Sequence, residues 1–224
     1  MSVLQTPPIK VLLLSRFPIV IYGLERLLEN HRPAIKVVGA ATDREAAIAA
    51  LTKQTPDVVL IEISTTAGLE IIAELLAALP GRVLVMTDSN DTEVIDGAVA
   101  LGASGIVKKT DPVDVYYKAL ERVAHGELWL DRVTTGRVFQ QMLRKKPDPK
   151  QSSEQTRIAT LTRKERLTVV EIGRDASAST PEIAARLHIS DHTLRNHLTS
   201  IYAKLALSNR VELYAFANRN DIKP

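Results

Sequence analysis

Five apolar runs, each followed by an amphipathic segment, constrain the fold of this chain more than any other feature. The runs lie at residues 9–14, 34–42, 57–63, 82–87 and 105–109. Short, continuous apolar runs are typical of strands that a sheet buries on both faces. The segments between the runs place apolar residues at helical spacing. The pattern therefore predicts an α/β domain of five βα units, with a parallel, doubly wound sheet in the flavodoxin-like order.

A second pattern, over residues 180–205, predicts two helices that flank a tight turn. Thr180 suits the N-cap of the first helix and Pro181 its first helical position, where a missing N–H costs nothing. Residues 188–190 form the turn, and Ser190 or Asp191 caps the next helix. An apolar stripe at helical spacing then follows, made by Leu194, Leu198, Ile201 and Leu205. Together these segments have the helix-turn-helix pattern.

The polar face of the second helix indicates what it could bind. Residues 192–205 contain no acid, and Arg195, Asn196 and Thr199 point away from the apolar stripe. A guanidinium, an amide and a hydroxyl are the groups that read base edges in the DNA major groove. A solvated amphipathic helix is the alternative for an isolated segment. The helix and turn that precede this one favour DNA recognition.

The C-terminal sequence contains four blocks, in this order: LTRKE, PEIAARLHIS, TLRNHLTSIYAKL and LSNRVEL. Together they resemble the LuxR-type DNA-binding domain. The resemblance implies an all-α domain of four helices over residues 159–224, in which Arg195, Asn196 and Thr199 contact bases. It implies phosphate contacts by four further side chains, Ser190, Thr193, His197 and Lys204.

The same resemblance assigns structural roles at both ends of this domain. Thr162 and Glu165 match the cap of the family's first helix and its buried acid. Asn209 and Arg210 match the turn that begins the last helix, which such domains use to dimerise. We therefore expect a homodimer that binds double-stranded DNA.

The N-terminal half contains the segments VLLLSRFPIVIYGLERLLE, PDVVLIEI, RVLVMTDSND and GASGIVKKTDP. Together they resemble the receiver domain of NarL-type response regulators. Receivers hold Mg²⁺ with two acids after the first strand and take a phosphoryl group on an Asp at the end of the third. Here Ser15 and Arg16 occupy the positions of the acid pair, and Glu62 that of the acceptor. Only Thr87 and Lys109 match the pattern, so the receiver is degenerate.

These replacements predict that the usual phosphorylation does not occur. Mg²⁺ needs oxygen ligands in near-octahedral geometry, whereas Ser15 offers a weak neutral oxygen and Arg16 a fixed positive charge. Glu62 is one methylene longer than Asp, and misplacement by about 1 Å can cost on the order of a hundredfold in rate. Arg16 could replace the metal by pairing with Glu62, with Lys109 on the same carboxylate. The alternative is that Arg16 points to solvent and the site has decayed.

Charge and composition agree with two domains. Residues 1–144 contain 15 basic and 17 acidic side chains, whereas residues 145–224 contain 14 and 9. A basic C-terminal part suits a polyanionic partner. The polar segment 145–157, with two prolines, predicts a flexible linker. We expect a receiver-like domain in 1–128, a connecting helix and linker in 129–158, and the DNA-binding domain in 159–224.

Together the patterns predict a phosphorylation-independent, dimeric transcription regulator. The alternative is a receiver-like interaction module that sequesters a partner, with DNA binding secondary. No nucleophilic triad, zinc spacing or phosphate loop is present, so we expect no enzyme activity, metal or cofactor. A protein partner or a small ligand at the receiver would then replace phosphorylation as the input. With no cysteine, signal peptide or apolar run of membrane-spanning length, a cytoplasmic location is expected.

Overall fold

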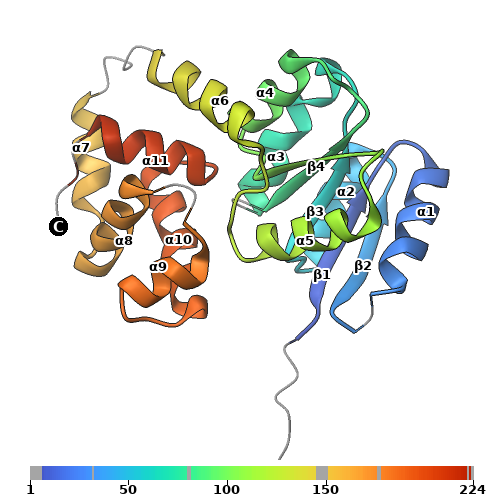
Figure 1. The fold of residues 1–224 in the computed structure, drawn as a ribbon, viewed down its shortest axis with the longest axis horizontal. Helices are drawn as coiled ribbons and strands as arrows, with labels where there is room; N and C mark the ends of the chain where they lie inside the picture. Colours follow the sequence, from blue (N-terminus) through green and yellow to red (C-terminus); the bar gives the residue numbers. More distant parts are fainter. Residues whose placement is uncertain are drawn as a thin grey trace, which may run out of the picture.

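The computed structural model describes residues 7–31, 33–79, 82–144, 151–175, 178–220 and 222. In these ranges the chain forms two lobes (Figure 1). The sheet lobe spans residues 7–130, and the helical lobe spans residues 151–222. Helix α6 (Arg132–Arg144) lies between them along the upper side of the view. No helix in the described ranges is long and apolar enough to span a bilayer.

The sheet lobe contains five parallel strands in the order β2-β1-β3-β4-β5. They are β1 (Ile9–Leu14), β2 (Ile35–Ala41), β3 (Val58–Glu62), β4 (Val83–Thr87) and β5 (Gly105–Lys108). The inner strands are apolar along most of their length because helices cover both faces of the sheet. This order confirms the predicted flavodoxin-like sheet. All five carboxyl ends lie at one edge of the sheet, where the chemistry of such folds is found.

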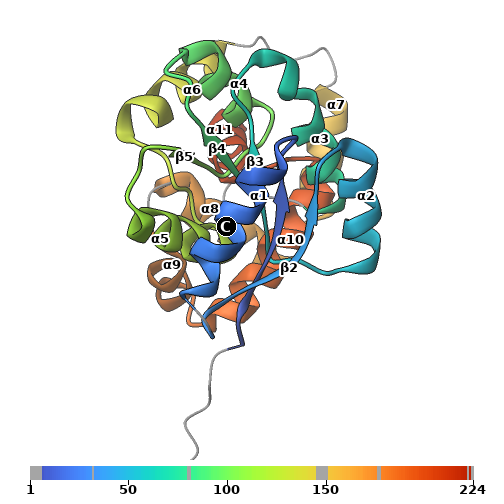
Figure 2. The same ribbon diagram turned by 90° about the vertical axis from the view of Figure 1, so that its right-hand side faces the viewer.

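Five helices cover the two faces of the sheet. Helices α1 (Pro18–Glu29) and α5 (Val113–Ala124) share one apolar core with the strands. The core on the other face contains three helices, α2 (Arg44–Lys53), α3 (Glu70–Ala78) and α4 (Thr92–Ala100). Figure 2 shows α5 on one side of the sheet and α2 and α3 on the other. A short 3₁₀ helix, η1 (Thr66–Gly68), follows β3.

The helical lobe contains the predicted helix-turn-helix. Its helices are α7 (Gln151–Ala159), α8 (Arg163–Arg174), α9 (Thr180–Arg186), α10 (Asp191–Leu205) and α11 (Arg210–Arg219). Ser190 caps α10 by accepting from the Thr193 N–H, as expected. The prediction of Thr180 as the cap of α9 was wrong by one residue. Ser179 and Glu182 form a capping box there, and Thr180 is the first helical residue.

Glu165 connects α8 to α10 at the centre of the helical lobe. Thr162 caps α8, and Glu165 completes the capping box by accepting from the Thr162 N–H at 2.7 Å. The same carboxylate pairs with Lys204 Nζ at 2.7 Å and accepts from Ser200 Oγ at 2.6 Å. Burial acts to raise the pKa of Glu165, but the hydrogen bonds from Lys204, Ser200 and Thr162 lower it to about 2. The expected buried acid is confirmed.

The predicted flexible linker is partly helical. Residues 145–150 lie outside the described residues, but α7 begins at Gln151 and includes the rest of that segment. Two contacts explain the helix: Arg219 pairs with Glu154 at 3.0 Å, and Arg157 donates to the Leu205 carbonyl at 2.9 Å. Ile158, at the end of α7, also packs on the apolar core of the lobe. Polar composition predicted a coil here because it does not show these long-range partners.

The two lobes are in contact at the start of α11. Asn209 Nδ2 donates to the Val99 carbonyl at 3.2 Å, while Asn209 Oδ1 caps α11 by accepting from the Glu212 N–H. Beside it, Val211 packs with Val99 and with Val138 of α6 in a fully buried apolar cluster. Helix α6 is fixed in turn by a bidentate pair between Arg137 and Asp96, with bonds of 2.9 and 2.7 Å. This interface therefore combines apolar burial with directed polar bonds.

Two further contacts fix the relative position of the lobes. The Thr180 N–H donates to Glu127 Oε1 at 2.8 Å, and the Thr180 hydroxyl donates to the His125 carbonyl at 2.8 Å. In the turn between α4 and β5, Gly102 has φ of 115° and lies against Ser208. A Cβ at position 102 would stand 2.6 Å from the Ser208 Cβ, so only glycine allows this approach.

Glu165→Gln is expected to lower the free energy of unfolding at pH 7 by about 2–4 kcal/mol, because it leaves Lys204 partly buried without its counter-charge. The carboxylate pKa is lower in the folded state than its usual value of 4.5. Its contribution is therefore complete above about pH 4.5, and it is lost as the pH falls through about 2. Urea denaturation followed by circular dichroism, at pH 7 and at pH 3, checks the expectation.

A matched control is Asp114→Asn, which removes an ion pair with Lys118 in which both side chains are largely exposed. Exposed pairs contribute about 0–1 kcal/mol, so this change should be small at both pH values. A Glu165→Gln effect that is equally small, or that grows on acidification, would contradict the assigned role.

Candidate functional site

Three predicted site residues meet at the carboxyl edge of the sheet. Ser15 follows β1, Glu62 ends β3 and Lys109 follows β5. The Glu62 side chain is only 3% exposed, and its two carboxylate oxygens have different partners. Ser15 Oγ donates to one oxygen, and the Lys109 ammonium forms an ion pair with the other. The carboxylate at the acceptor position is thus buried and already engaged.

Lys109 has several partners at this edge. Its ammonium lies 3.4 Å from Ser64 Oγ and 3.5 Å from Asp88 Oδ2, in addition to its pair with Glu62. Burial acts to lower the pKa of Lys109, but the hydrogen bond and charge of Glu62, together with Asp88, raise it overall. The ammonium therefore keeps its positive charge beside Glu62.

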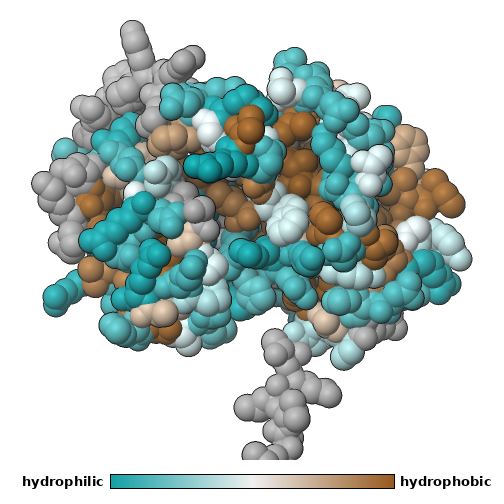
Figure 3. Space-filling model, in the orientation of Figure 1, coloured by the Kyte–Doolittle hydropathy of each residue, from teal (hydrophilic) through white to brown (hydrophobic). Residues whose placement is uncertain are grey.

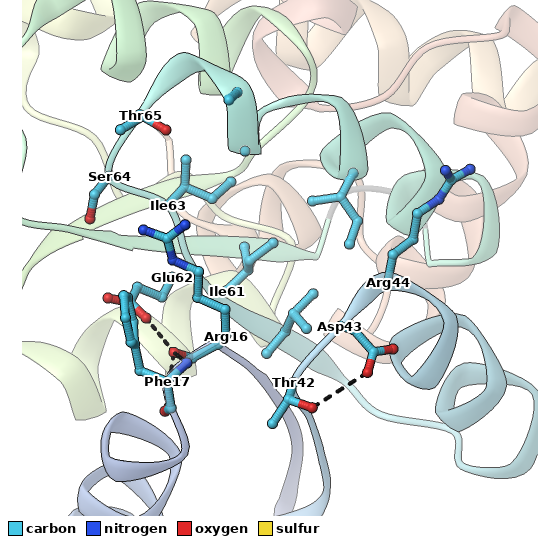
Figure 4. Close-up of a pocket in the computed structure, with 15 residues that line it drawn as sticks. Arg16, Phe17, Thr42, Asp43, Arg44, Ile61, Glu62, Ile63, Ser64 and Thr65 are labelled. Carbon is cyan, nitrogen blue, oxygen red and sulfur yellow. Dashed lines mark hydrogen bonds between the residues drawn. The ribbon is translucent and has the colours of Figure 1, made fainter.

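Arg16 does not pair with Glu62, which contradicts the first of the two alternatives for this side chain and agrees with the second, in which it points to solvent. Its guanidinium lies over the Phe17 ring, 4.7 Å from the centroid, and the residue is exposed. Figure 4 shows Arg16 among the side chains that line the pocket. The hydrogen bond to Glu62 comes from its neighbour Ser15. Within the described ranges, no hydrogen bond or ion pair joins Arg16 to Glu62. The cause is that Ser15 and Lys109 already occupy both oxygens of that carboxylate.

The sequence reasoning missed two residues that line this edge. Asp88 and Ser64 both contact Lys109, and the hydrogen bond from Ser64 is the main cause that lowers the pKa of Asp88. Asp88 directly follows β4 and Ser64 lies two residues after β3, and this closeness to a strand end was the signal that could have identified them. Thr87 is fully buried, and its hydroxyl accepts from the Ser89 N–H at 3.0 Å. Thr87 thus orders the β4–α4 loop in this structure.

The residues at this edge do not fit the Mg²⁺ that receivers hold. A cavity of about 240 Å³ opens beside Ser15, Arg16 and Glu62, but no acid pair follows β1. In the described parts of the chain, no cluster of three or more acidic, histidine or cysteine side chains is arranged to hold a metal. The Glu62 oxygens are directed to a hydroxyl and an ammonium rather than to a metal position. The donor set is therefore wrong in both charge and number.

The predicted base-contacting side chains lie in the first half of α10. Asn196 and Thr199 are exposed. Asn196 Nδ2 lies 3.3 Å from His192 Nε2, and Thr199 Oγ1 donates to the Arg195 carbonyl at 3.1 Å. Among the described residues, both side chains bond only within their own helix, so neither polar group is committed to another described element. This arrangement leaves them free to exchange these bonds for others.

Arg195 differs because it faces the sheet lobe. The residue is half-buried, and its Nε is buried without a hydrogen-bond partner among the described residues. Burial lowers the pKa of Arg82, at the start of β4, and the charge of Arg195 acts in the same direction. One turn further along α10, Leu198 is buried close to Gly126 of the sheet lobe. Part of the predicted reading face is therefore covered by the sheet lobe.

The four predicted phosphate-contacting side chains lie in different surroundings. Ser190 and Thr193 are at the N-terminus of α10, with their hydroxyl oxygens 2.8 Å apart. His197 Nδ1 lies 3.5 Å from Thr168 Oγ1 of α8. Lys204 is directed inward to Glu165. Ser190 and Thr193 thus remain at the surface, whereas Lys204 supports the core of the lobe.

Comparison with known proteins places both lobes in families. Residues 11–121 match the family model of the response regulator receiver domain, and residues 159–217 match that of bacterial regulatory proteins of the luxR family. The two models coincide with the sheet lobe and with the helix-turn-helix lobe. This order of domains is the one that the sequence predicted.

Similar proteins extend over nearly the whole chain. The chain is 28% identical to the transcriptional regulatory protein LnrK of Bacillus subtilis, covering 94% of this chain and 97% of LnrK. It is 29% identical to the nitrate/nitrite response regulator NarL of Escherichia coli, covering 96% and 97%. A solved structure, the response regulator ChrA of a heme-sensing system, has 25% identity, a TM-score of 0.48, and coverage of 97% and 100%. The chain is therefore a NarL-type response regulator, in which a receiver domain precedes a LuxR-type DNA-binding domain that serves transcription regulation.

Proposed function

We propose that this response regulator binds specific double-stranded DNA sites as a homodimer, without aspartyl phosphorylation of its receiver. The observation that carries the proposal is the buried Glu62 carboxylate, engaged by Ser15 and Lys109. The proposed domains are a degenerate receiver in residues 1–128, a connection in 129–158 and the DNA-binding domain in 159–224. In this proposal, separation of the two lobes controls DNA binding, and phosphorylation at the Glu62 position does not.

The physical case against phosphorylation rests on charge. Phosphoryl transfer depends on positive charge placed at the transferring oxygens, which a metal supplies in these sites. Ser15 and Arg16 cannot hold that metal, and the Glu62 oxygens would have to leave both of their partners before either could attack. Each bond to a charged group contributes about 1.5–3 kcal/mol, so freeing the carboxylate is costly. The ion pair between Lys109 and Glu62 also favours a receiver that stays in one conformation.

We expect no phosphoryl adduct when the full chain is incubated with acetyl phosphate and Mg²⁺ and analysed by intact mass spectrometry under non-acidic conditions. A triple variant that restores the acids, Ser15→Glu, Arg16→Asp and Glu62→Asp, should bind Mg²⁺ and form an acyl phosphate. The variant serves as the positive control because the sheet that positions these residues is unchanged. A phosphoryl adduct on any carboxylate of the native chain would contradict the proposal.

DNA reading is proposed for the exposed first half of α10. Arg195, Asn196 and Thr199 supply the groups that bond base edges, while Ser190 and Thr193 supply hydroxyls for phosphates. His197 and Lys204 are assigned to the same backbone contacts, and Lys204 would have to exchange part of its bond with Glu165 for a phosphate. Arg195 becomes fully available only when the lobes separate.

Arg195→Ala is expected to cost about 1–3 kcal/mol of binding to the specific operator and to relax base preference at one position. Lys53→Ala, in α2 of the sheet lobe and far from α10 in sequence, is a charge-matched control that should bind unchanged. Electrophoretic mobility shift with genomic fragments, followed by a competition series at fixed salt, measures both. Retained regulation in an Arg195→Ala, Asn196→Ala double variant would instead favour a receiver-like module that sequesters a partner.

Domain separation can be tested at Asn209. Asn209→Asp keeps the oxygen that caps α11 but replaces the amide donor that bonds the Val99 carbonyl with a charged acceptor. We expect the variant to open the interface, to increase the radius of gyration in solution scattering and to bind DNA more tightly. Asn218→Asp makes the same charge change on an exposed part of α11. An Asn209→Asp protein that stays compact and binds DNA no better than the control would refute the role of separation.

Dimerisation through α11 requires the same separation. The LuxR resemblance assigns the last helix to dimer contacts, but in this structure Val211 is packed against Val99 and Val138. Opening the interface would expose this apolar position for a second copy. Sedimentation velocity of the Asn209→Asp variant should therefore show more dimer than the native chain at equal concentration.

A further inference from the structure

A cavity of about 740 Å³ lies between the two lobes. Its walls come from the end of α5, from residues 127–130 after it, from α6, from the end of α8, and from α11. In Figure 3, hydrophobic atoms lie between the lobes and hydrophilic atoms border them. This volume is within the range of small-molecule sites, which often form at domain interfaces. The cavity is separate from the Glu62 edge described above.

Arg210 is the most unusual side chain of this cavity. It is only 2% exposed, yet Nε and Nη2 have no hydrogen-bond partner among the described residues. Burial lowers the pKa of Arg210, although nearby acidic groups act in the opposite direction. A buried guanidinium normally has a bonded counter-charge, because desolvation of an unpaired charge costs several kcal/mol. These two donor groups are buried and lack an acceptor, which an anionic group bound in the adjoining cavity would supply.

Glu127, a carboxylate whose charge acts on Arg210, already has other partners on both of its oxygens. Glu127 lines the cavity, but one of its oxygens pairs with Arg122 at 2.7 Å and the other accepts from the Thr180 N–H at 2.8 Å. Arg132 and Arg174 bring two more guanidinium groups to the cavity wall. Of the four arginines in the lining, Arg122 pairs with Glu127 and Arg174 pairs with Glu171. The positive charge of the lining therefore rests on Arg132 and Arg210, opposed by Asp175.

The rest of the wall is apolar and aromatic. Phe139 of α6 and Tyr214 of α11 are in contact, with ring centroids 5.0 Å apart. Leu128, Leu130 and Val211 add aliphatic surface. A wall of this kind favours an organic body over a hydrated inorganic ion, because its apolar area is removed from water on binding.

We propose that this cavity binds a small organic anion, whose carboxylate or phosphate group bonds Arg210 and whose apolar body packs on Phe139 and Tyr214. Such a ligand contacts residues 127–130 of the sheet lobe and α11 of the helical lobe at the same time. It therefore holds the lobes together and lowers DNA affinity. This last step rests on the proposed function, whereas ligand binding itself does not.

Binding is tested first, without DNA. Isothermal titration of the full chain with phenyl phosphate should give saturable binding, and the neutral analogue benzyl alcohol should bind at least about tenfold more weakly. Arg210→Met should weaken phenyl phosphate binding about tenfold or more, because bonds to a charged group are lost. Arg219→Met, on the same helix but outside the cavity lining, is the matched control and should bind like the native chain.

Arg210→Met removes a buried charge and keeps an unbranched side chain, so it is expected to fold. Arg132→Ala, at an exposed position of the cavity wall, provides a second variant that leaves the core intact and should also weaken binding. Absence of saturable binding by phenyl phosphate, or equal affinity in native and Arg210→Met proteins, would overturn the site.

The regulatory step is tested separately by mobility shift. Phenyl phosphate should weaken operator binding by the native chain and should not change binding by Arg210→Met. Titration that succeeds while DNA binding is absent altogether would refute the proposed function and leave the site standing. Ligand binding with unchanged operator affinity would overturn only the proposed coupling.

Discussion

The bonds at the start of α11 determine how the rest of this molecule is arranged. The Asn209 side chain caps α11 with its oxygen and holds the Val99 carbonyl with its amide. Around it, the valine cluster of α4, α6 and α11 excludes water and so strengthens the polar contact. Because α11 is fixed in this way, α10 lies with Arg195 against the sheet lobe. The covered reading face and the cavity between the lobes both follow from this contact.

The receiver lobe keeps its fold but has a different charge arrangement at its carboxyl edge. Ser15 donates a hydrogen bond to one oxygen of Glu62, and Lys109 forms an ion pair with the other. A receiver of this kind can still act as a docking partner for the helical lobe. In the proposed function, regulation acts on the equilibrium between docked and separated lobes, and a ligand shifts it only by binding one state better than the other.

The sequence predicted the architecture well because the determining interactions are local or periodic. Apolar runs specify buried strands, and Ser190 and Thr162 specify caps through bonds that reach only three residues along the chain. The candidate site was predicted in part: Glu62 and Lys109 meet as expected, but Arg16 does not join them. Ser15 and Arg16 are adjacent in sequence, and the sequence does not reveal which of the two side chains bonds Glu62. In the structure it is Ser15.

The interface between the lobes could not be predicted at all. Thr180 suits an N-cap by its residue type, yet its N–H and hydroxyl bond Glu127 and the His125 carbonyl in the other lobe. The polar segment before Ile158 became helical for a similar reason, through contacts with residues about 50 to 65 positions away. Such partners leave no trace in local periodicity. Arg210 is also ordinary in sequence and becomes distinctive only through its burial.

The turn at Gly102 connects the stability of one lobe to the placement of the other. Its positive φ is required by the α4–β5 turn, and its missing side chain is required by Ser208 across the interface. A single position is therefore under two independent steric constraints, one on the backbone and one on the surface. Gly102 is a loop residue, but it should tolerate as few substitutions as a residue of the hydrophobic core. Insertions in this turn would move the DNA-binding helices without altering any residue of the helical lobe.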